Sequence, residues 1–239
     1  MYFEYYIMGI ILLPGLLFAI YAQSKVNSTF REYRRVMAHS NITASELIKR
    51  LLNSSELGHI NVRQINGTLT DYYDPQKEEI CLSSDVYNSS SIASLGVACH
   101  ELGHALQKKD GYLPYKIRTI LVPITNIIST LLWPLIIIGL IFNIGVGAGG
   151  TVGNIFLWSG IIFFGIAVIF DLATLPVEYN ASNRALKILE TTGTLNEEEL
   201  EGTKKVLNSA ALTYVAQLLV SILNLVRFLL VALRHRSRD

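Results

Sequence analysis

Long apolar runs dominate the second half of the chain. Residues 119–170 form a stretch of 52 positions without one charged side chain. A bilayer core requires about 20 apolar residues per helix, so this stretch is long enough for two crossings. Its middle, residues 143–154, is rich in glycine and asparagine and opposes a continuous helix. The pattern therefore predicts two transmembrane helices, at about 119–142 and 155–175, joined by a tight connection.

Apolar segments also lie near both ends of the chain. A third span is predicted at about residues 5–22, and Glu4 stands where a cleavable signal would carry positive charge. A fourth segment, at about 210–233, is interrupted by Asn224 and Arg227. This segment predicts a helix that either spans the membrane or lies along its surface, which makes three or four transmembrane helices in total.

The stretch between the first two spans has the pattern of a small α+β structure. Thr43 is followed three residues later by Glu46, which predicts a capping box and a short amphipathic helix. Apolar and polar residues alternate over 60–65, as in a strand, and an Asn-Gly pair follows them as a turn signal. Residues 78–82 have the composition of a further strand. We therefore expect a small sheet beside the helix.

Three more helices are predicted outside the spans. A serine-rich stretch supplies caps for a helix at about 92–109, which Gly111 closes. Pro176 is expected to start a helix that continues over about 178–190. Another helix is expected to start near Asn196, where three glutamates in the first turn complement the helix dipole.

The distribution of lysine and arginine predicts how these parts face the membrane. Basic residues are concentrated in residues 23–118 and 176–207, and positive loops tend to stay on the cytoplasmic side. We therefore expect a single domain, residues 1–239, that is mainly α-helical and integral to the membrane, with a small α+β part in the cytoplasm. The lipid bilayer is then an expected partner. The net charge of +1 gives no reason to expect that the protein binds nucleic acid.

A metal-binding pattern lies just before the charge-free stretch, in the sequence VACHELGHALQ. His100 and His104 are one helical turn apart, so both imidazoles can reach one tetrahedral ion. Glu101 lies on the adjoining flank, where it can take a proton from a water that zinc has acidified. The alternative is a chance match on a packed helix, because HExxH patterns arise by accident. The caps and the apolar flanks of this helix favour zinc.

A catalytic zinc site needs a third protein ligand. Glu178 is the preferred candidate, because two crossings of the membrane return the chain to the face that it left. A glutamate there could instead simply favour a helix dipole. Asp171 is the rival carboxylate, and His39 and His59 are further candidates in loop-like contexts.

Two other groups of side chains each allow more than one interpretation. Asp71 and Asp74 precede the strand at 78–82 and fit either turn chemistry or a sheet edge that pairs with an extended substrate. An oxyanion could be stabilised by any of four residues, among which the sequence does not select: Tyr72, Tyr73, Tyr179 and Arg184.

Taken together, these residues resemble the YugP-like family of bacterial membrane zinc metallopeptidases, also called neutral zinc metallopeptidases. The resemblance covers nearly the whole chain. It is carried by the HELGHALQ core together with LTDYYDP at 69–75, LSSDVYN at 82–88, LPVEYNAS at 175–182 and AALTYVA at 210–216.

The resemblance implies a multi-pass protease of the bacterial inner membrane, of gluzincin type, with its active site facing the cytoplasm. It implies one zinc ion per chain, held by His100, His104 and Glu178, with Glu101 as the catalytic acid and base. The family is similar in layout to a larger group that includes the heat-shock protease HtpX and the CAAX prenyl protease. In that group an aspartate follows the glutamate ligand by four residues. Ser182 stands there in this chain, so the partner of the zinc histidines is undetermined.

The function expected from the sequence is that of a zinc-dependent endopeptidase. Its substrates would be proteins or peptides, including misfolded membrane proteins, in membrane-protein quality control or processing. The alternative is a membrane zinc protein without enzymatic activity, either a scaffold or a sensor. Substitution of Glu101 separates the two, because only the peptidase needs a proton acceptor beside the metal.

Overall fold

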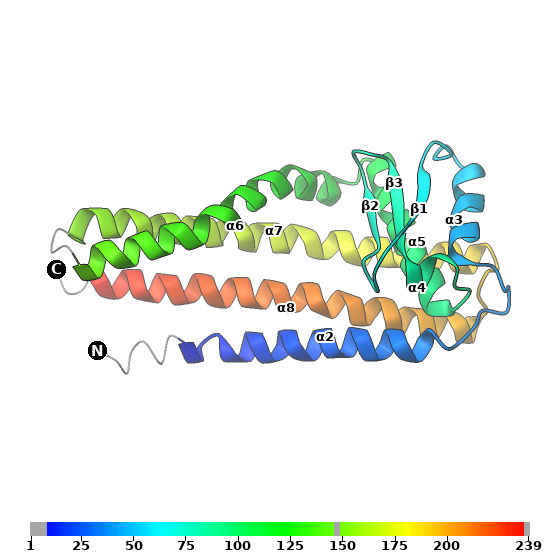
Figure 1. Ribbon diagram of the computed structural model, residues 1–239, viewed down its shortest axis with the longest axis horizontal. Helices are drawn as coiled ribbons and strands as arrows, with labels where there is room; N and C mark the ends of the chain where they lie inside the picture. The colour runs from blue at the N-terminus through cyan, green and yellow to red at the C-terminus, as the bar shows by residue number, and fades with distance from the viewer. Residues whose placement is uncertain (1–8, 146–148, 237–239) are drawn as a thin grey trace. The chain divides into compact units, whose positions relative to one another are not determined.

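The computed structural model describes residues 9–145 and 149–236, and the chain divides into two compact units (Figure 1). The first, here called the helical unit, consists of Met1–Tyr21, Lys116–Leu175 and Tyr214–Asp239. The second, here called the mixed unit, consists of Ala22–Tyr115 and Pro176–Thr213. Each unit therefore draws on segments that are far apart in the sequence.

Helices dominate the chain, and they accompany one small sheet, as the sequence predicted. The elements follow in the order α2 (Leu13–Tyr33), α3 (Ala44–Asn53), β1 (Asn61–Ile65), β2 (Tyr72–Asp74), β3 (Glu79–Ser83), α4 (Ser84–Tyr87), α5 (Ile92–Lys109), α6 (Leu113–Gly145), α7 (Gly149–Thr191) and α8 (Glu197–Arg236).

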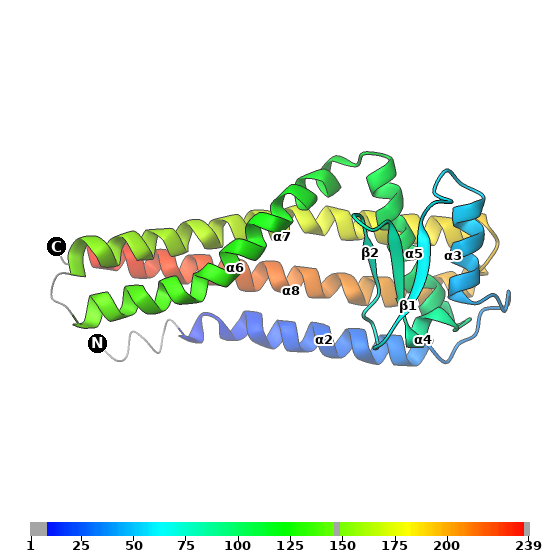
Figure 2. The ribbon, with the colours of Figure 1, turned by 45° about the horizontal axis from the view of Figure 1, so that its top comes forward.

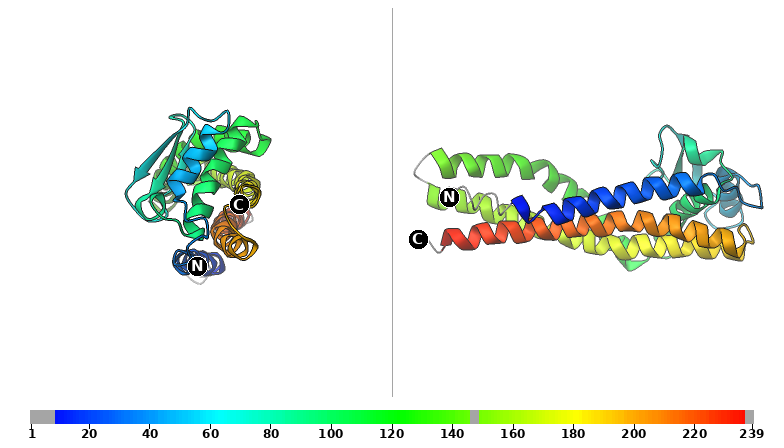
Figure 3. Two further views of the ribbon diagram at one scale, coloured as in Figure 1. Left: turned by 90° about the vertical axis from the view of Figure 1, so that its right-hand side faces the viewer. Right: turned by 90° about the horizontal axis from the view of Figure 1, so that it is seen from below.

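Within the helical unit, α7 and α8 lie side by side (Figure 3). The rings of Phe164 and Phe228 stack with their centroids 4.9 Å apart. The hydroxyl of Ser221 donates to a carboxylate oxygen of Asp171 at 2.5 Å. Apolar stacking and one buried polar contact therefore hold these two helices together.

Two helical segments among the described residues are long and apolar enough to cross a bilayer, judged by length and composition. They are Trp158–Thr191 in α7 and Glu197–Leu230 in α8. Large apolar side chains are also exposed on the helical unit, among them Leu16, Leu17, Ile20, Ile120, Ile127, Ile162, Ile169 and Leu172. Exposed apolar surface on this scale marks an interaction with a membrane or another protein.

The mixed unit has one continuous hydrophobic core, and α5 lies at its centre (Figure 2). Ser91 caps α5, because its side chain accepts a hydrogen bond from the amide of Ser94 at 3.2 Å. The core includes the buried side chains of Ile48, Leu82, Leu95 and Leu189. Each comes from a different element, namely α3, β3, α5 and α7, so the core joins the two segments of the mixed unit.

The sheet has the strand order β1-β3-β2, with β3 in the middle (Figure 1). β1 pairs with β3 in parallel, and β2 pairs with β3 antiparallel. The sequence predicted the outer strand β1 and the central strand β3 but not β2, which has only three residues. Asp74 at the end of β2 has a turn role, since its carboxylate accepts from the amides of Gln76 and Lys77 at 2.9 and 3.1 Å.

The prediction that Pro176 starts a helix was wrong, because α7 runs through this residue without interruption. Proline has no amide hydrogen and cannot donate to the carbonyl of Leu172, which weakens the helix locally. The helix continues because Val177 and Ala181 are fully buried beyond the proline. The boundary between the two units in α7 falls between Leu175 and Pro176, at this missing hydrogen bond.

The connection predicted at 143–154 is helical in those of its residues that the structure describes. α6 continues to Gly145 and α7 begins at Gly149, and residues 146–148 lie outside the described residues. Glycine and asparagine are therefore accommodated at these helix ends. Their low helix propensity is outweighed by the long apolar helices that they extend.

Two further boundaries differ from the predictions. The helix expected near Asn196 and the segment at 210–233 belong to one helix, α8. The predicted first span, 5–22, lies partly outside the described residues, which begin at Gly9, and the rest belongs to α2 and the residues before it.

The capping box at the start of α3 gives a test of local stability. The Thr43 side chain accepts from the amide of Glu46, and the Glu46 carboxylate accepts from the amide of Thr43. Thr43→Ala is expected to cost about 1 kcal/mol, so amide hydrogen exchange in α3 should become about fivefold faster. Thr191→Ala is the control, because Thr191 is exposed and its hydroxyl donates only to carbonyls of its own helix. Unchanged exchange in Thr43→Ala would contradict this role of the cap.

Candidate metal centre

Helix α5 carries His100 and His104 on one face. Their rings meet edge to face, with the centroids 4.7 Å apart. The spacing of one turn predicted this, and the burial of α5 in the core of the mixed unit fixes it. Both side chains are largely shielded from solvent, with exposed fractions of 14% for His100 and 10% for His104.

Helix α7 approaches α5 closely at Gly103, between the two histidines in sequence. A Cβ atom at Gly103 would lie 2.7 Å from the carbonyl oxygen and 3.1 Å from the Cα atom of Ala181. Real Cβ atoms do not come so close to a backbone, so only glycine permits this approach. As a result Glu178, one turn before Ala181, reaches the histidine face.

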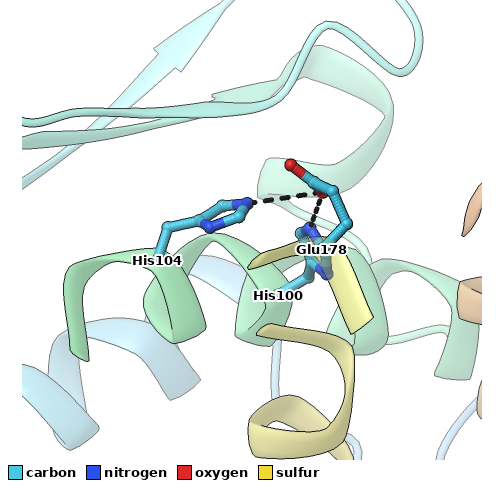
Figure 4. Close-up of side chains that lie close together, drawn as sticks. All are labelled: His100, His104 and Glu178. Carbon is cyan, nitrogen blue, oxygen red and sulfur yellow. Dashed lines mark hydrogen bonds and ion pairs between the residues drawn. The ribbon is translucent and has the colours of Figure 1, made fainter. Parts of the chain in front are cut away.

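The three side chains converge on one point (Figure 4). Oε2 of Glu178 lies 3.1 Å from Nε2 of His100 and 3.6 Å from Nε2 of His104. One ligand atom from each residue can be chosen so that all three lie within 4.8 Å of one another. This is a geometry in which a single cation can contact all three, and the sequence had proposed the same three residues.

At this site, burial and the neighbouring charged groups shift the pKa values of the side chains in opposite directions. Burial alone would raise the pKa of Glu178, but the hydrogen bond from His100 and the nearby imidazole of His104 reverse the effect and hold this pKa far below its usual range. Burial alone would lower the pKa of His104, but the nearby carboxylates of Glu178 and Glu101 outweigh burial and raise that pKa. The site therefore stabilises a positive charge beside an ionised Glu178.

The other ring nitrogen of each histidine also has a partner. Nδ1 of His100 lies 3.1 Å from the hydroxyl of Ser182, and Nδ1 of His104 lies 3.0 Å from Oε1 of Gln107. The sequence left these partners undetermined, because Ser182 stands where relatives of similar layout have aspartate. The structure thus places a hydroxyl and an amide behind the histidines.

Comparison with known proteins agrees with this geometry. A family model described as "Putative neutral zinc metallopeptidase" matches residues 8–233. The chain belongs to this family. A Bacillus subtilis (strain 168) protein named "Putative membrane protease YugP" is 40% identical over 222 residues, which cover 92% of this chain and 94% of that protein. No solved structure matches the chain. The resemblance to the YugP-like family is therefore confirmed.

The residues at the site fit the metal that the family description implies. Two imidazole nitrogens and one carboxylate oxygen are the donor set of one class of catalytic zinc site. Among the described residues, His100, His104 and Glu178 form the group of histidine and acidic side chains that can hold an ion. Three protein ligands would leave one position of a tetrahedral ion open for water or substrate.

Glu101 and Asp71 bring two further carboxyl groups to this region. Glu101 is buried, with 8% of its surface exposed. Asp71 accepts from the amide and the hydroxyl of Ser83 at 2.7 and 3.1 Å. Burial raises the pKa of Asp71 to about 6, the bonds from Ser83 oppose this, and the charge of Glu101 adds to it. Asp71 therefore anchors β3 and shares its electrostatic environment with Glu101.

The rival ligands named from the sequence have other partners. Asp171 accepts from Ser221 within the helical unit. His39 lies 2.7 Å from Glu199, and its side chain is half exposed. His59 pairs with Glu78 at 3.3 Å. The structure does not bring any of these three into the group of His100, His104 and Glu178.

Two residues that shape the site were missed in the sequence. Gly103 sets the approach of α7, and Gln107 contacts both His104 and α7. A signal for Gln107 existed, because it follows His104 by three positions and so shares its helical face.

Of the oxyanion candidates, Arg184 is engaged by Asp110 and Asn180, while Tyr72 and Tyr179 are more than 40% exposed.

The close approach at Gly103 can be tested by adding one methyl group. In Gly103→Ala the new Cβ would overlap the backbone of Ala181, so α7 must shift, and we expect a loss of about 1–3 kcal/mol in unfolding free energy. Thermal unfolding of the purified protein measures the change. Gly165→Ala, also in α7, is the control, because a Cβ there meets no described atom within 4 Å. Equal stability of the two variants would exclude the tight contact.

Proposed function

We propose that this protein is a zinc-dependent endopeptidase. The observation that carries the proposal is the convergence of Nε2 of His100, Nε2 of His104 and Oε2 of Glu178. Glu101, which follows His100 in the sequence, is also buried. Membership of the metallopeptidase family supports it. In this proposal His100, His104 and Glu178 hold one zinc ion per chain, and Glu101 is the catalytic acid and base.

The proposed reaction is the attack of water on a peptide carbonyl. When bound, zinc supplies Lewis acidity, which makes a water molecule easier to deprotonate and polarises a carbonyl. Glu101 accepts the proton of the attacking water and later transfers it to the nitrogen of the leaving amine. The low exposure of His100, His104 and Glu178 excludes bulk water, which strengthens every charge interaction at the site.

The edge of the sheet is the proposed place for the substrate chain. β2 is an edge strand, since it pairs only with β3 in the strand order β1-β3-β2, and it packs near α5. An extended peptide can add to such an edge through backbone hydrogen bonds. Because these bonds involve no side chains of the substrate, this mode would accept unfolded segments of varied sequence.

The proposed setting is the bacterial inner membrane. The name of the Bacillus subtilis relative, the two long apolar helical segments and the exposed apolar side chains of the helical unit all support membrane association. We further propose a multi-pass arrangement in which residues 23–118 and 176–207 face the cytoplasm, as the distribution of lysine and arginine favours. Loops and ends of misfolded membrane proteins would then be accessible substrates.

Substitution of Glu101 tests the peptidase proposal. Glu101→Gln is expected to keep one zinc per chain but to reduce cleavage of an unfolded protein at least about 100-fold, because the proton acceptor is lost. Metal analysis and cleavage are measured on the same purified samples. Glu56→Gln is the control, because Glu56 is a strongly exposed partner of Lys109. If Glu101→Gln cleaved as fast as the wild type, or if neither cleaved, a zinc scaffold or sensor would be the better description.

Substitution of Glu178 tests the ligand set. Glu178→Ala removes the only acidic ligand among the three proposed for zinc, so zinc affinity should fall by more than about 100-fold, beyond the loss typical of residues that merely orient a ligand. Competition with a chelator of known affinity measures it. Glu190→Ala, an exposed glutamate on the same helix, should bind zinc as the wild type does. Unchanged binding in Glu178→Ala would point to Asp171 or a further histidine instead.

A further inference from the structure

Gln107 is a fully buried side chain that connects α5 to α7. Its amide nitrogen donates to the backbone carbonyl of Val177 at 2.7 Å and to Oδ1 of Asn180 at 3.0 Å. Its oxygen, Oε1, lies 3.0 Å from Nδ1 of His104. A buried amide has two hydrogens to donate, and both are used on α7.

The partners of Gln107 determine which end of its side-chain amide is the nitrogen and which is the oxygen. The carbonyl of Val177 can only accept, so the atom that faces it must be the nitrogen. Asn180 has an amide of its own that could turn either way, but Nε of Arg184 donates to its Oδ1 at 2.8 Å. A guanidinium only donates and is always charged, so it keeps the oxygen of Asn180 in place.

Arg184 is in turn held by an ion pair at the surface. Its guanidinium lies 2.5 Å from a carboxylate oxygen of Asp110, the residue that caps the end of α5. The resulting chain of contacts runs from Asp110 through Arg184, Asn180 and Gln107 to His104. All five side chains belong to the mixed unit, and each contact along the chain allows only one assignment of donor and acceptor.

The last contact in this chain decides the tautomer of His104. Because Oε1 of Gln107 can only accept, Nδ1 of His104 must carry the hydrogen. In the other tautomer two lone pairs would face each other at 3.0 Å. The distance of 3.6 Å from Nε2 to Glu178 is too long for a hydrogen bond that could favour a proton on Nε2 instead.

We propose that Gln107, fixed by Asn180 and Arg184, is a positioning residue that presets the Nδ1–H tautomer of His104 and so keeps Nε2 free to bind zinc. This inference rests on the proposed zinc site, and it assigns to a neutral amide the task that a carboxylate performs in many zinc proteins. The benefit is preorganisation, because the neutral imidazole of His104 presents an unprotonated Nε2 to the metal without a change of tautomer.

His100 provides an internal contrast. Its Nδ1 lies 3.1 Å from the hydroxyl of Ser182, and a hydroxyl can either donate or accept. Ser182 is therefore compatible with both tautomers of His100. It also lets Nε2 of His100 donate to Glu178, 3.1 Å away, before metal binds. One histidine is thus preset and the other is adjustable.

Nitrogen-15 NMR of histidine-labelled, metal-free protein tests the tautomer directly. Spectra are recorded at alkaline pH, where the imidazole is neutral, and the His104 signals are assigned by their loss in His104→Gln. The wild type and Gln107→Glu, which keeps an acceptor, should show the hydrogen on Nδ1. Gln107→Met, of similar size but without an acceptor, should shift the hydrogen to Nε2. Ser182→Ala is the control and should leave His104 unchanged.

Zinc affinity, measured by competition with a chelator, is the second readout. Gln107→Met should bind zinc about 10- to 100-fold more weakly than the wild type, and Gln107→Glu should recover most of the loss. If Gln107→Met kept the Nδ1–H tautomer, or if Gln107→Glu lost as much affinity as Gln107→Met, the inference would be overturned. A wild type that binds no zinc but shows the preset tautomer would refute the proposed function and leave the tautomer assignment intact.

The outer part of the chain of contacts is tested at Arg184. Arg184→Met removes the donor that holds Oδ1 of Asn180, which leaves the Gln107 amide fixed by Val177 alone. A minor population of the other His104 tautomer and a loss of affinity smaller than that of Gln107→Met are therefore expected. Arg63→Met is the matched control, because Arg63 also forms an ion pair at the surface of the mixed unit, with Glu79. If both arginine variants matched the wild type in both readouts, Arg184 would have no part in presetting His104.

Discussion

The site depends on the contact between α5 and α7 at Gly103. The two helices approach until the position of a missing Cβ lies 2.7 Å from the backbone of Ala181. At a usual interaxial distance of 8–10 Å, side chains separate two helices. Here the absence of a side chain lets a carboxylate from one helix reach two imidazoles on the other. Glu178 and the histidines therefore meet because one residue has no side chain.

This contact joins segments that are remote in the sequence. The chain leaves the mixed unit at Tyr115, contributes Lys116–Leu175 to the helical unit, and re-enters the mixed unit at Pro176. The core then binds the returning segment, since Ala185 and Leu189 are fully buried in it. Packing of these apolar residues supplies the free energy that holds Glu178, with 2% of its surface exposed, among polar partners.

Sequence patterns predicted which side chains lie close together better than they predicted the boundaries of the helices. His100 and His104 share a spacing that has one geometric consequence, so their proximity could be predicted. The proposal of Glu178 needed the additional argument that two crossings return the chain. Pro176 was misleading because the local effect of proline was outweighed by the burial of Val177 and Ala181 after it. Gly103 and Gln107 were missed because their roles depend on a partner helix, which a local pattern does not contain.

The neutral groups behind the histidines follow from the charge already present. Glu101 and Glu178 are buried, and the pKa of Asp71, which the charge of Glu101 helps to raise, is about 6. A further aspartate at position 182 would add a negative charge to this low-dielectric region, where like charges repel strongly. A hydroxyl and an amide can orient imidazoles without that cost, provided that they are themselves held in place. Gln107 meets this condition through its two bonds to α7, and the ion pair that completes its support lies at the surface, where charge is solvated.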